Sequence, residues 1–284
     1  MNNYFILNLC SLIAFFSYLC IIMRLVLIGA GNLATNMGKA LKGAGHDIIQ
    51  VYSRTMLSAR MLADVLECDA TDDLQTVSAD ADIYILSVKD AVLEHVANIV
   101  CNGKEERLFL HTAGSVSMTC FLGKAQNYGV LYPMQTFSKS REVDFREIPC
   151  FIEANSPEAL QQINRLAASI SNHVVCMSSN DRKYLHLAAV WACNFTNHCY
   201  DMAAEILEKH GISFRVMLPL IDETAKKVHT LTPRQAQTGP AVRYDENVIR
   251  AQIQLMKGSH LQQKLYEQLS KSIHQTHLEK KKYD

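Results

Sequence analysis

Over the first 178 positions, short apolar runs take turns with segments of helical periodicity, which predicts strands separated by helices. Short, uninterrupted apolar runs are typical of strands buried on both faces of a sheet. They occupy residues 25–28, 47–52, 81–88, 107–111, 129–133, 149–153 and 173–177. Helical spacing falls at 32–44, 56–66 and 91–100, and Ser156-Pro157 opens a further helix. We therefore predict an α/β fold with a doubly wound parallel sheet.

After Met177 the strand pattern stops and helical periodicity continues. The predicted helices are 181–210, 213–228, 245–258 and 259–277, with a loop at 232–244. Pro219 should kink or split the second of these helices. We therefore expect one domain at 23–178 and an all-helical second domain at 179–284. A helix as long as the first is hard to bury within so few residues, which predicts a homodimer formed through this half.

The first 22 residues carry no charge and are mostly apolar. They could form a membrane anchor or a cleaved signal peptide. However, the first predicted strand begins at Arg24, which leaves no linker between such a segment and the sheet. We therefore favour Met23 as the true start, with residues 1–22 an over-extension of the reading frame.

The charge balance and the cysteines narrow the class of protein. Lys plus Arg and Asp plus Glu each number 28 among 284 residues, so the net charge is zero. This argues against nucleic acid as a partner, because such proteins usually show a basic excess. The nine cysteines form no C-x-x-C pair and no zinc-ligand spacing, so we expect no metal. They are typical of buried residues in a reducing, cytoplasmic compartment, with a catalytic thiol as the alternative.

The first predicted strand runs directly into Gly29-Ala30-Gly31-Asn32-Leu33-Ala34. Gly29 permits a tight turn, Gly31 lets the backbone approach a diphosphate, and Ala34 allows close packing of the helix on the strand. The helix begins near Asn32 and Leu33, so its free N–H groups face the phosphates. A glycine turn between a strand and a helix indicates a Rossmann-type dinucleotide-binding domain.

The end of the second predicted strand bears on the choice of dinucleotide. An acidic residue here would bind the ribose 2′-hydroxyl of NAD. The chain instead has Ser53, Arg54 and Thr55, whose hydroxyls and guanidinium suit a 2′-phosphate. The alternative is that Arg54 is an ordinary solvated residue. We therefore predict NADP as the cofactor.

Ligands of doubly wound sheets bind at the carboxyl ends of the strands. Val88 and Lys89 follow one predicted strand, and His111 and Thr112 stand at the end of another. These four residues complete the predicted cofactor site.

Four polar residues of the helical half are candidates for substrate chemistry. His186 and Asn194 are eight residues apart on the predicted long helix, so both can lie on one face. His186 could donate a proton near neutral pH or serve as a core histidine, and Asn194 could instead bond a neighbouring helix. Thr238 and Arg243 lie in a compact polar turn. Arg243 could bind a substrate carboxylate, or pair with Asp245 as a structural salt bridge.

Residues from Met23 to about Lys271 resemble the bacterial family described as Rossmann-like with a domain of unknown function 2520, a family of NADP oxidoreductases. The resemblance is carried by Gly29–Ala34, His111–Ser115, Tyr132–Phe137, His186–Ala189 with Asn194-Phe195, and Gln237–Pro240 with Arg243 and Asp245. The family more often has a histidine where this chain has Tyr132.

More distantly, the chain is similar to pyrroline-carboxylate reductase, ketopantoate reductase and the β-hydroxyacid dehydrogenases. That similarity implies a helical dimerisation domain like that of 6-phosphogluconate dehydrogenase, with substrate in the cleft between the domains. Ketopantoate reductase and the β-hydroxyacid enzymes carry a lysine and an asparagine on the first long helix. His186 stands near the lysine position and Asn194 one or two turns further on.

Two functions remain open from the sequence, and the relatives raise a deazaflavin as an alternative cofactor that no residue here selects. The first is an NADPH-dependent reductase of a small carbonyl or imine compound, with His186 as the acid and Asn194 or Thr238 orienting the substrate. The second is a dimer that binds NADP without turnover and acts as a redox sensor or scaffold, which the missing lysine favours.

Overall fold

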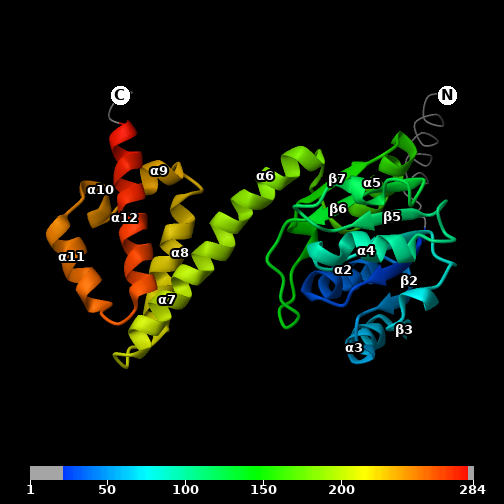
Figure 1. Cartoon of the computed structure of the whole chain (residues 1–284), viewed down its shortest axis with the longest axis horizontal. Coiled ribbons are helices and arrows are strands. Elements are labelled where there is room, and N and C mark those ends of the chain that lie inside the picture. Colours follow the sequence, from blue (N-terminus) through cyan, green and yellow to red (C-terminus); the bar gives the residue numbers. More distant parts are fainter. Residues whose placement is uncertain (1–21, 281–284) are drawn as a thin grey trace, which may run out of the picture. The chain divides into compact units, whose positions relative to one another are not determined.

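The computed structural model describes residues 22–280 (Figure 1). The three interpretations of the leader concern residues that, apart from Ile22, lie outside this range. Within the described residues, none of the helices combines the length and the apolar character needed to cross a membrane.

Eight strands form a single sheet in the order β3-β2-β1-β4-β5-β6-β7-β8. They are β1 (Arg24–Ile28), β2 (Asp47–Tyr52), β3 (Asp69–Thr71), β4 (Ile83–Leu86), β5 (Leu108–His111), β6 (Asn127–Pro133), β7 (Cys150–Ala154) and β8 (Val174–Cys176). The predicted doubly wound fold is confirmed, and β3 was not predicted. One pairing departs from the expected parallel sheet, because β6 and β7 are antiparallel. The connection between them, residues 134–149, contains the short 3₁₀ helix η3 (Phe145–Glu147) but no crossover α-helix.

Four α-helices cover the two faces of the sheet (Figure 1). They are α2 (Asn32–Gly43), α3 (Met56–Leu66), α4 (Asp90–Val100) and α5 (Pro157–Ile170). The side chains of β1 alternate between the two cores. Leu25 and Leu27 pack with α2, α3 and α5, whereas Val26 and Ile28 pack with α4 and with the 3₁₀ helices η1 (Leu74–Thr76) and η2 (Met118–Phe121). Burial on both faces explains why β1 has no polar residue after Arg24.

The chain forms two compact units, which divide between Trp191 and Ala192. The division falls within a helical segment, not at the expected boundary after residue 178. The long helix predicted at 181–210 is present as α6 (Ser179–Ala189) and α7 (Thr196–Glu208). Between them the chain forms a π-helical stretch, η4 (Val190–Phe195), which the sequence pattern did not predict.

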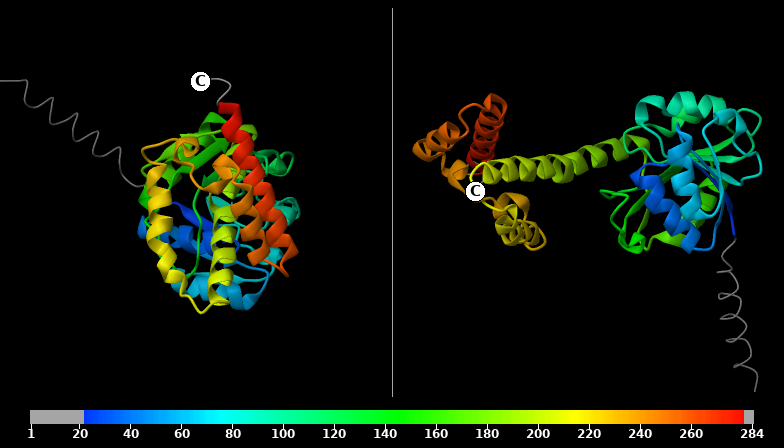
Figure 2. Two further views of the ribbon diagram at one scale, coloured as in Figure 1. Left: turned by 90° about the vertical axis from the view of Figure 1, so that its left-hand side faces the viewer. Right: turned by 90° about the horizontal axis from the view of Figure 1, so that it is seen from below.

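The second unit consists of helices alone in its described part (Figure 2). After α7 it contains η5 (Phe214–Met217), α8 (Leu218–Lys227), α9 (Pro233–Ala236), α10 (Pro240–Arg243), α11 (Glu246–Leu255) and α12 (His260–Lys280). Pro219 stands in the first turn of α8 after a 3₁₀ turn, so the expected split is confirmed. The expectation of a plain loop at 232–244 was wrong. Prolines begin both short helices there, because the first helical turn needs no proline N–H.

The second unit has little interior of its own. Among its described residues, the buried side chains are Ala241, Ile249 and Ser270. Its exposed large apolar residues are Phe195, Ile206, Ile212, Val216, Leu218, Leu220, Val228, Leu231, Val248, Leu255, Leu261, Leu269 and Leu278. A helical unit of this size needs more buried apolar surface to be stable alone.

Candidate functional site

The glycine turn lies at the carboxyl end of β1, in the middle of the sheet. Gly29 has φ +125°, and a Cβ there would lie 2.2 Å from the carbonyl oxygen of Ser87, which follows β4. The Gly29 N–H also donates to the carbonyl of Tyr52 at the end of β2, at 2.8 Å. Both the backbone conformation and the packing therefore require glycine at this position.

At Gly31, neither the backbone conformation nor the packing of the chain requires a glycine. Its φ is −79°, which any residue can adopt, and a Cβ there would meet no atom within 4 Å. It is the N-cap of α2 but supplies no side-chain cap, and the first helical hydrogen bond runs from the Thr35 N–H to the Gly31 carbonyl. Open space therefore lies over the free N–H groups at the start of α2, which include those of Asn32 and Leu33.

The cluster Ser53-Arg54-Thr55 lies beside the glycine turn, because Tyr52 of β2 pairs with Ile28 of β1. Thr55 caps α3, with its hydroxyl oxygen accepting from the Ser58 N–H at 3.4 Å. Arg54 is exposed and makes no ion pair within residues 22–280. A free guanidinium beside the start of a helix is a suitable site for a phosphate.

The ends of β4 and β5 form the next part of this edge. Val88 and Lys89 lie between β4 and α4, and the Thr112 hydroxyl contacts the Ser87 hydroxyl at 3.2 Å. His111 is fully buried, and its Nδ1 accepts from the Ala113 N–H at 3.1 Å. Burial lowers the pKa of His111 to about 4, and the nearby charge of Arg182 adds to this effect. The imidazole is therefore neutral, and it shapes the turn after β5.

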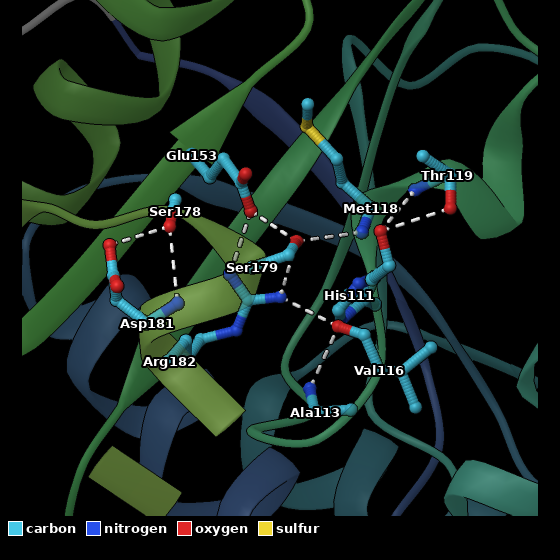
Figure 3. A network of polar contacts seen from close by, with 11 residues as sticks. His111, Ala113, Val116, Met118, Thr119, Glu153, Ser178, Ser179, Asp181 and Arg182 are labelled. Carbon is cyan, nitrogen blue, oxygen red and sulfur yellow. Dashed lines mark hydrogen bonds and ion pairs between the residues drawn. The ribbon is translucent and has the colours of Figure 1, made fainter. Parts of the chain in front are cut away.

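A buried polar network fixes α6 against the sheet (Figure 3). The Arg182 guanidinium is fully buried, pairs with Glu153 of β7 at 2.8 Å and donates to the Val116 carbonyl at 2.6 Å. The Ser179 hydroxyl donates to Glu153 and accepts from the Met118 N–H. Burial alone would raise the pKa of Glu153, but hydrogen bonds from Ser179 and Arg182 lower it. Glu153 therefore stays ionised at neutral pH.

His186 lies one turn after Arg182 on α6, against the turn that follows β5. A Cβ on Gly114 would lie 2.6 Å from His186 Nδ1, so the ring packs directly on this backbone. The same nitrogen lies 3.1 Å from the hydroxyl of Tyr132 at the end of β6. Because β5 and β6 are parallel, the imidazole and the phenol share the carboxyl edge with the glycine turn.

The remaining predicted site residues belong to the second unit. Asn194 lies in η4, where the backbone is not α-helical, so its eight-residue spacing from His186 does not fix a common face. Thr238 precedes α10, and Arg243 ends it. Asp245 caps α11 by accepting from the Val248 N–H and makes no ion pair with Arg243. The alternative of a structural salt bridge is therefore not supported.

Sequence reasoning missed Arg182, Glu153 and Gly114, and it did not link Tyr132 to His186. Arg182 could have been noticed because it lies four residues before His186, on the same face of a helix. Nothing in the pattern indicated that its side chain is buried.

Burial raises the pKa of four cysteine thiols, to about 11 for Cys68, Cys120 and Cys150 and about 12 for Cys101. These thiols are therefore poor nucleophiles.

A mostly parallel sheet with a glycine turn and an uncapped helix start at the carboxyl end of its first strand defines the class of Rossmann-type dinucleotide-binding proteins. Comparison with known families agrees. Residues 24–112 match the family model "NADP oxidoreductase coenzyme F420-dependent". Residues 148–273 match the "Domain of unknown function (DUF2520)".

The structure is similar to that of a "putative NADP oxidoreductase" from Bacteroides fragilis, with 54% sequence identity and a TM-score of 0.88. The match covers 90% of this chain and 99% of that one. The chain belongs to this family of NADP oxidoreductases. The expected family, the enzyme class and NADP as cofactor are thereby confirmed.

More distant structures share the fold. A protein from Thermotoga maritima is 22% identical with a TM-score of 0.64, over 90% of this chain and 99% of that one. An imine reductase from Myxococcus stipitatus, solved with NADP+, is 14% identical with a TM-score of 0.62, over 92% and 94% of the chains. A 1-pyrroline-5-carboxylate reductase from Streptococcus pyogenes is 14% identical with a TM-score of 0.59, over 89% and 99%. The search of curated proteins gave no match.

Proposed function

We propose that the protein is an NADPH-dependent reductase of a small carbonyl or imine compound. The family supplies the class of enzyme, and two structures that share its fold are imine and pyrroline-carboxylate reductases. Within the chain, the proposal is supported by one polar edge of the sheet, which carries an open glycine, a free arginine and a histidine.

The observation that carries the cofactor proposal is the open space at Gly31. Neither the backbone conformation nor any neighbouring atom requires glycine there, and Gly31 stands at the N-cap of α2, where a diphosphate would approach the backbone. The N–H groups of Asn32 and Leu33 would bind the diphosphate, and Ser53, Arg54 and Thr55 the 2′-phosphate. The edge toward the nicotinamide would be lined by Val88, Lys89 and Thr112. His111 would support the turn that follows β5.

When bound, NADPH supplies the hydride, and the chain must supply a proton. We assign the proton to His186 as the general acid, because it lies at this edge of the sheet and, unlike His111, is not fully buried. Arg243, which has no ion-pair partner among the described residues, would bind a substrate carboxylate. Asn194 and Thr238 would orient the carbonyl oxygen or imine nitrogen.

The exposed apolar surface of the second unit supports a homodimer through this half. A second copy of the chain is the occupant that we propose, because the unit buries few side chains by itself while more than ten large apolar side chains are exposed. Burial of such a surface is the main driving force for stable association.

A pair of glycine substitutions within one helix tests the cofactor site. Gly31→Ala places a methyl group in the open space at the start of α2, and Gly43→Ala places one at the end of the same helix, also with no atom within 4 Å. We expect Gly31→Ala to weaken NADPH binding at least tenfold without loss of stability. Gly43→Ala should leave binding unchanged and stabilise the helix by up to about 1 kcal/mol.

The measurement is a fluorescence titration of each variant with NADPH and with NADH, alongside urea unfolding. The wild type should bind NADPH more tightly than NADH. Unchanged NADPH binding in Gly31→Ala would contradict the proposed site. If NADPH binds but no aldehyde, keto acid or cyclic imine is reduced, the reductase proposal fails and the cofactor-binding dimer takes its place.

A further inference from the structure

The contact between Tyr132 and His186 joins two elements that are 54 residues apart in the sequence. The Tyr132 hydroxyl lies 3.1 Å from His186 Nδ1, and the ring centroids are 6.0 Å apart in an edge-on arrangement. Both residues belong to the first compact unit. The sequence drew attention to Tyr132 because the family more often has a histidine there, but it assigned the residue no role.

Tyr132 is held firmly in place. It is buried, it packs with Val130 and Phe151, and its ring centroid lies 6.4 Å from that of Phe151, its partner across the β6–β7 ladder. A buried aromatic ring on a paired strand has little freedom, so the position of its hydroxyl oxygen is well defined.

His186 is held from two further sides. One turn earlier on α6, Arg182 binds Glu153 and the Val116 carbonyl, which fixes the helix against the sheet (Figure 3). Gly114 contacts the imidazole directly, with no Cβ between the backbone and the ring. Helix α6, the turn at Gly114 and the Tyr132 phenol together define the orientation of the imidazole. Its Nδ1 faces Gly114 and the Tyr132 hydroxyl.

When the His186 imidazole is protonated and can act as an acid, the donor in its hydrogen bond with Tyr132 is unambiguous. Both nitrogens of an imidazolium are donors, so Nδ1–H donates to the Tyr132 hydroxyl oxygen. The proton that remains for transfer is on Nε2. When it passes to a substrate oxygen or nitrogen, Nδ1 keeps its own proton and its hydrogen bond, and Nε2 is later reprotonated by solvent.

We infer that Tyr132 is a positioning residue that binds Nδ1 of His186 and thereby makes Nε2 the nitrogen that exchanges protons with the substrate. The use of this arrangement in reduction depends on the proposed function, but the hydrogen bond itself does not. The inference can therefore be tested with a readout that needs no substrate.

The test is Tyr132→Phe, with Tyr128→Phe as the matched control. Tyr128 is a second buried tyrosine of β6, and it lies in a different core cluster. The measurement is a set of ¹H–¹⁵N spectra of the histidine rings at pH 5. The wild type and Tyr128→Phe should show one His186 ring N–H that exchanges slowly with water, and Tyr132→Phe should lose it. Absence of this signal in the wild type, or its survival in Tyr132→Phe, would overturn the inference.

Activity measurements separate this inference from the proposed function. Once a substrate is found, Tyr132→Phe should lower kcat at least tenfold and change the NADPH Kd less than twofold, and His186→Gln should abolish reduction. If His186→Gln stays fully active, the acid role of His186 fails even where the ring N–H is protected. If Tyr132→Phe loses the signal but keeps full kcat, the positioning role is wrong while the reductase proposal stands.

Discussion

Three glycines in the proposed site are needed for three different physical reasons. Gly29 has a positive φ and packs on Ser87, Gly114 leaves room for the ring of His186, and Gly31 faces open space. The first two are needed by the folded chain, and for the third we propose a bound ligand as the reason. The sequence motif already separates Gly29 from Gly31, but the reason for Gly114 can be seen only from the residues that surround it.

His111 makes stability depend on pH. Its pKa in the folded protein is about 4, against an ordinary value of 6.5, because the ring is buried. Between these values the unfolded chain binds a proton that the folded chain does not, so stability falls as the pH drops from about 6.5 to about 4. The full shift corresponds to about 3 kcal/mol. Urea unfolding of the wild type across this range should show the loss.

The matched variant is His111→Gln, which keeps a polar side chain and cannot titrate. Its stability should depend less on pH over the same range. His46 is buried as well and its pKa is also lowered, so a smaller dependence of the same sign should remain. An unchanged slope in His111→Gln would show that His111 does not stay neutral in the folded protein.

At the scale of elements, the ion pair between Arg182 and Glu153 connects α6 to β7. Glu153→Gln keeps the shape of the side chain but leaves a fully buried guanidinium without its anion. We expect this change to cost about 3 kcal/mol of unfolding free energy. Glu67→Gln is the control, because its partner Lys42 is partly exposed and the Glu67 side chain is 81% exposed. That change should have a much smaller effect on the free energy of unfolding, because solvent screens an exposed pair.

Chemical denaturation monitored by circular dichroism measures both variants. Equal losses in the two would mean that burial adds nothing to the Arg182 pair. A loss confined to Glu153→Gln would identify the network of Figure 3 as the connection that holds α6 in place.

Most helices and strands could be predicted because each has a local signal. The helix at Met56–Leu66 was predicted at its observed bounds, and helix starts were predicted at Ser156 and Asp245, which are the observed N-caps. The direction of β7 was not predicted, because an apolar run reads the same in both directions along a sheet. Nor was the π-helical stretch, since apolar periodicity does not reveal one extra residue in a turn.

The candidate site was predictable where it depends on the backbone and not where it depends on distant side chains. The glycine turn and the cluster after β2 are local motifs. By contrast, the contacts of His186 with Gly114 and Tyr132 join segments more than 50 residues apart. Such contacts are created by the strand order, which a single sequence does not encode visibly.

At the scale of the whole molecule, self-association is the main prediction. Leu220 of α8, in the second unit, is 58% exposed, and Val65 of α3, in the first unit, is 52% exposed. If the helical half forms the dimer interface, Leu220→Asp should raise the dimer dissociation constant at least tenfold, and Val65→Asp should have no such effect. Sedimentation equilibrium at several concentrations measures both variants.

The wild type should sediment as a dimer, and its melting temperature should rise with protein concentration. A wild-type monomer at all concentrations would contradict the proposed interface. The second unit would then have to be stable without a second copy of the chain, although it buries few side chains of its own.

The six residues Val190–Phe195 set the rotational phase of the helix that follows them. A π-helical turn holds about one residue more than an α-helical turn. Deleting one residue there, such as Cys193, would therefore let the backbone return to ordinary α-helical geometry while the side chains of α7 keep nearly their present directions. Relatives of this protein should for this reason tolerate a stretch that is one residue shorter, but not one that is shorter by two.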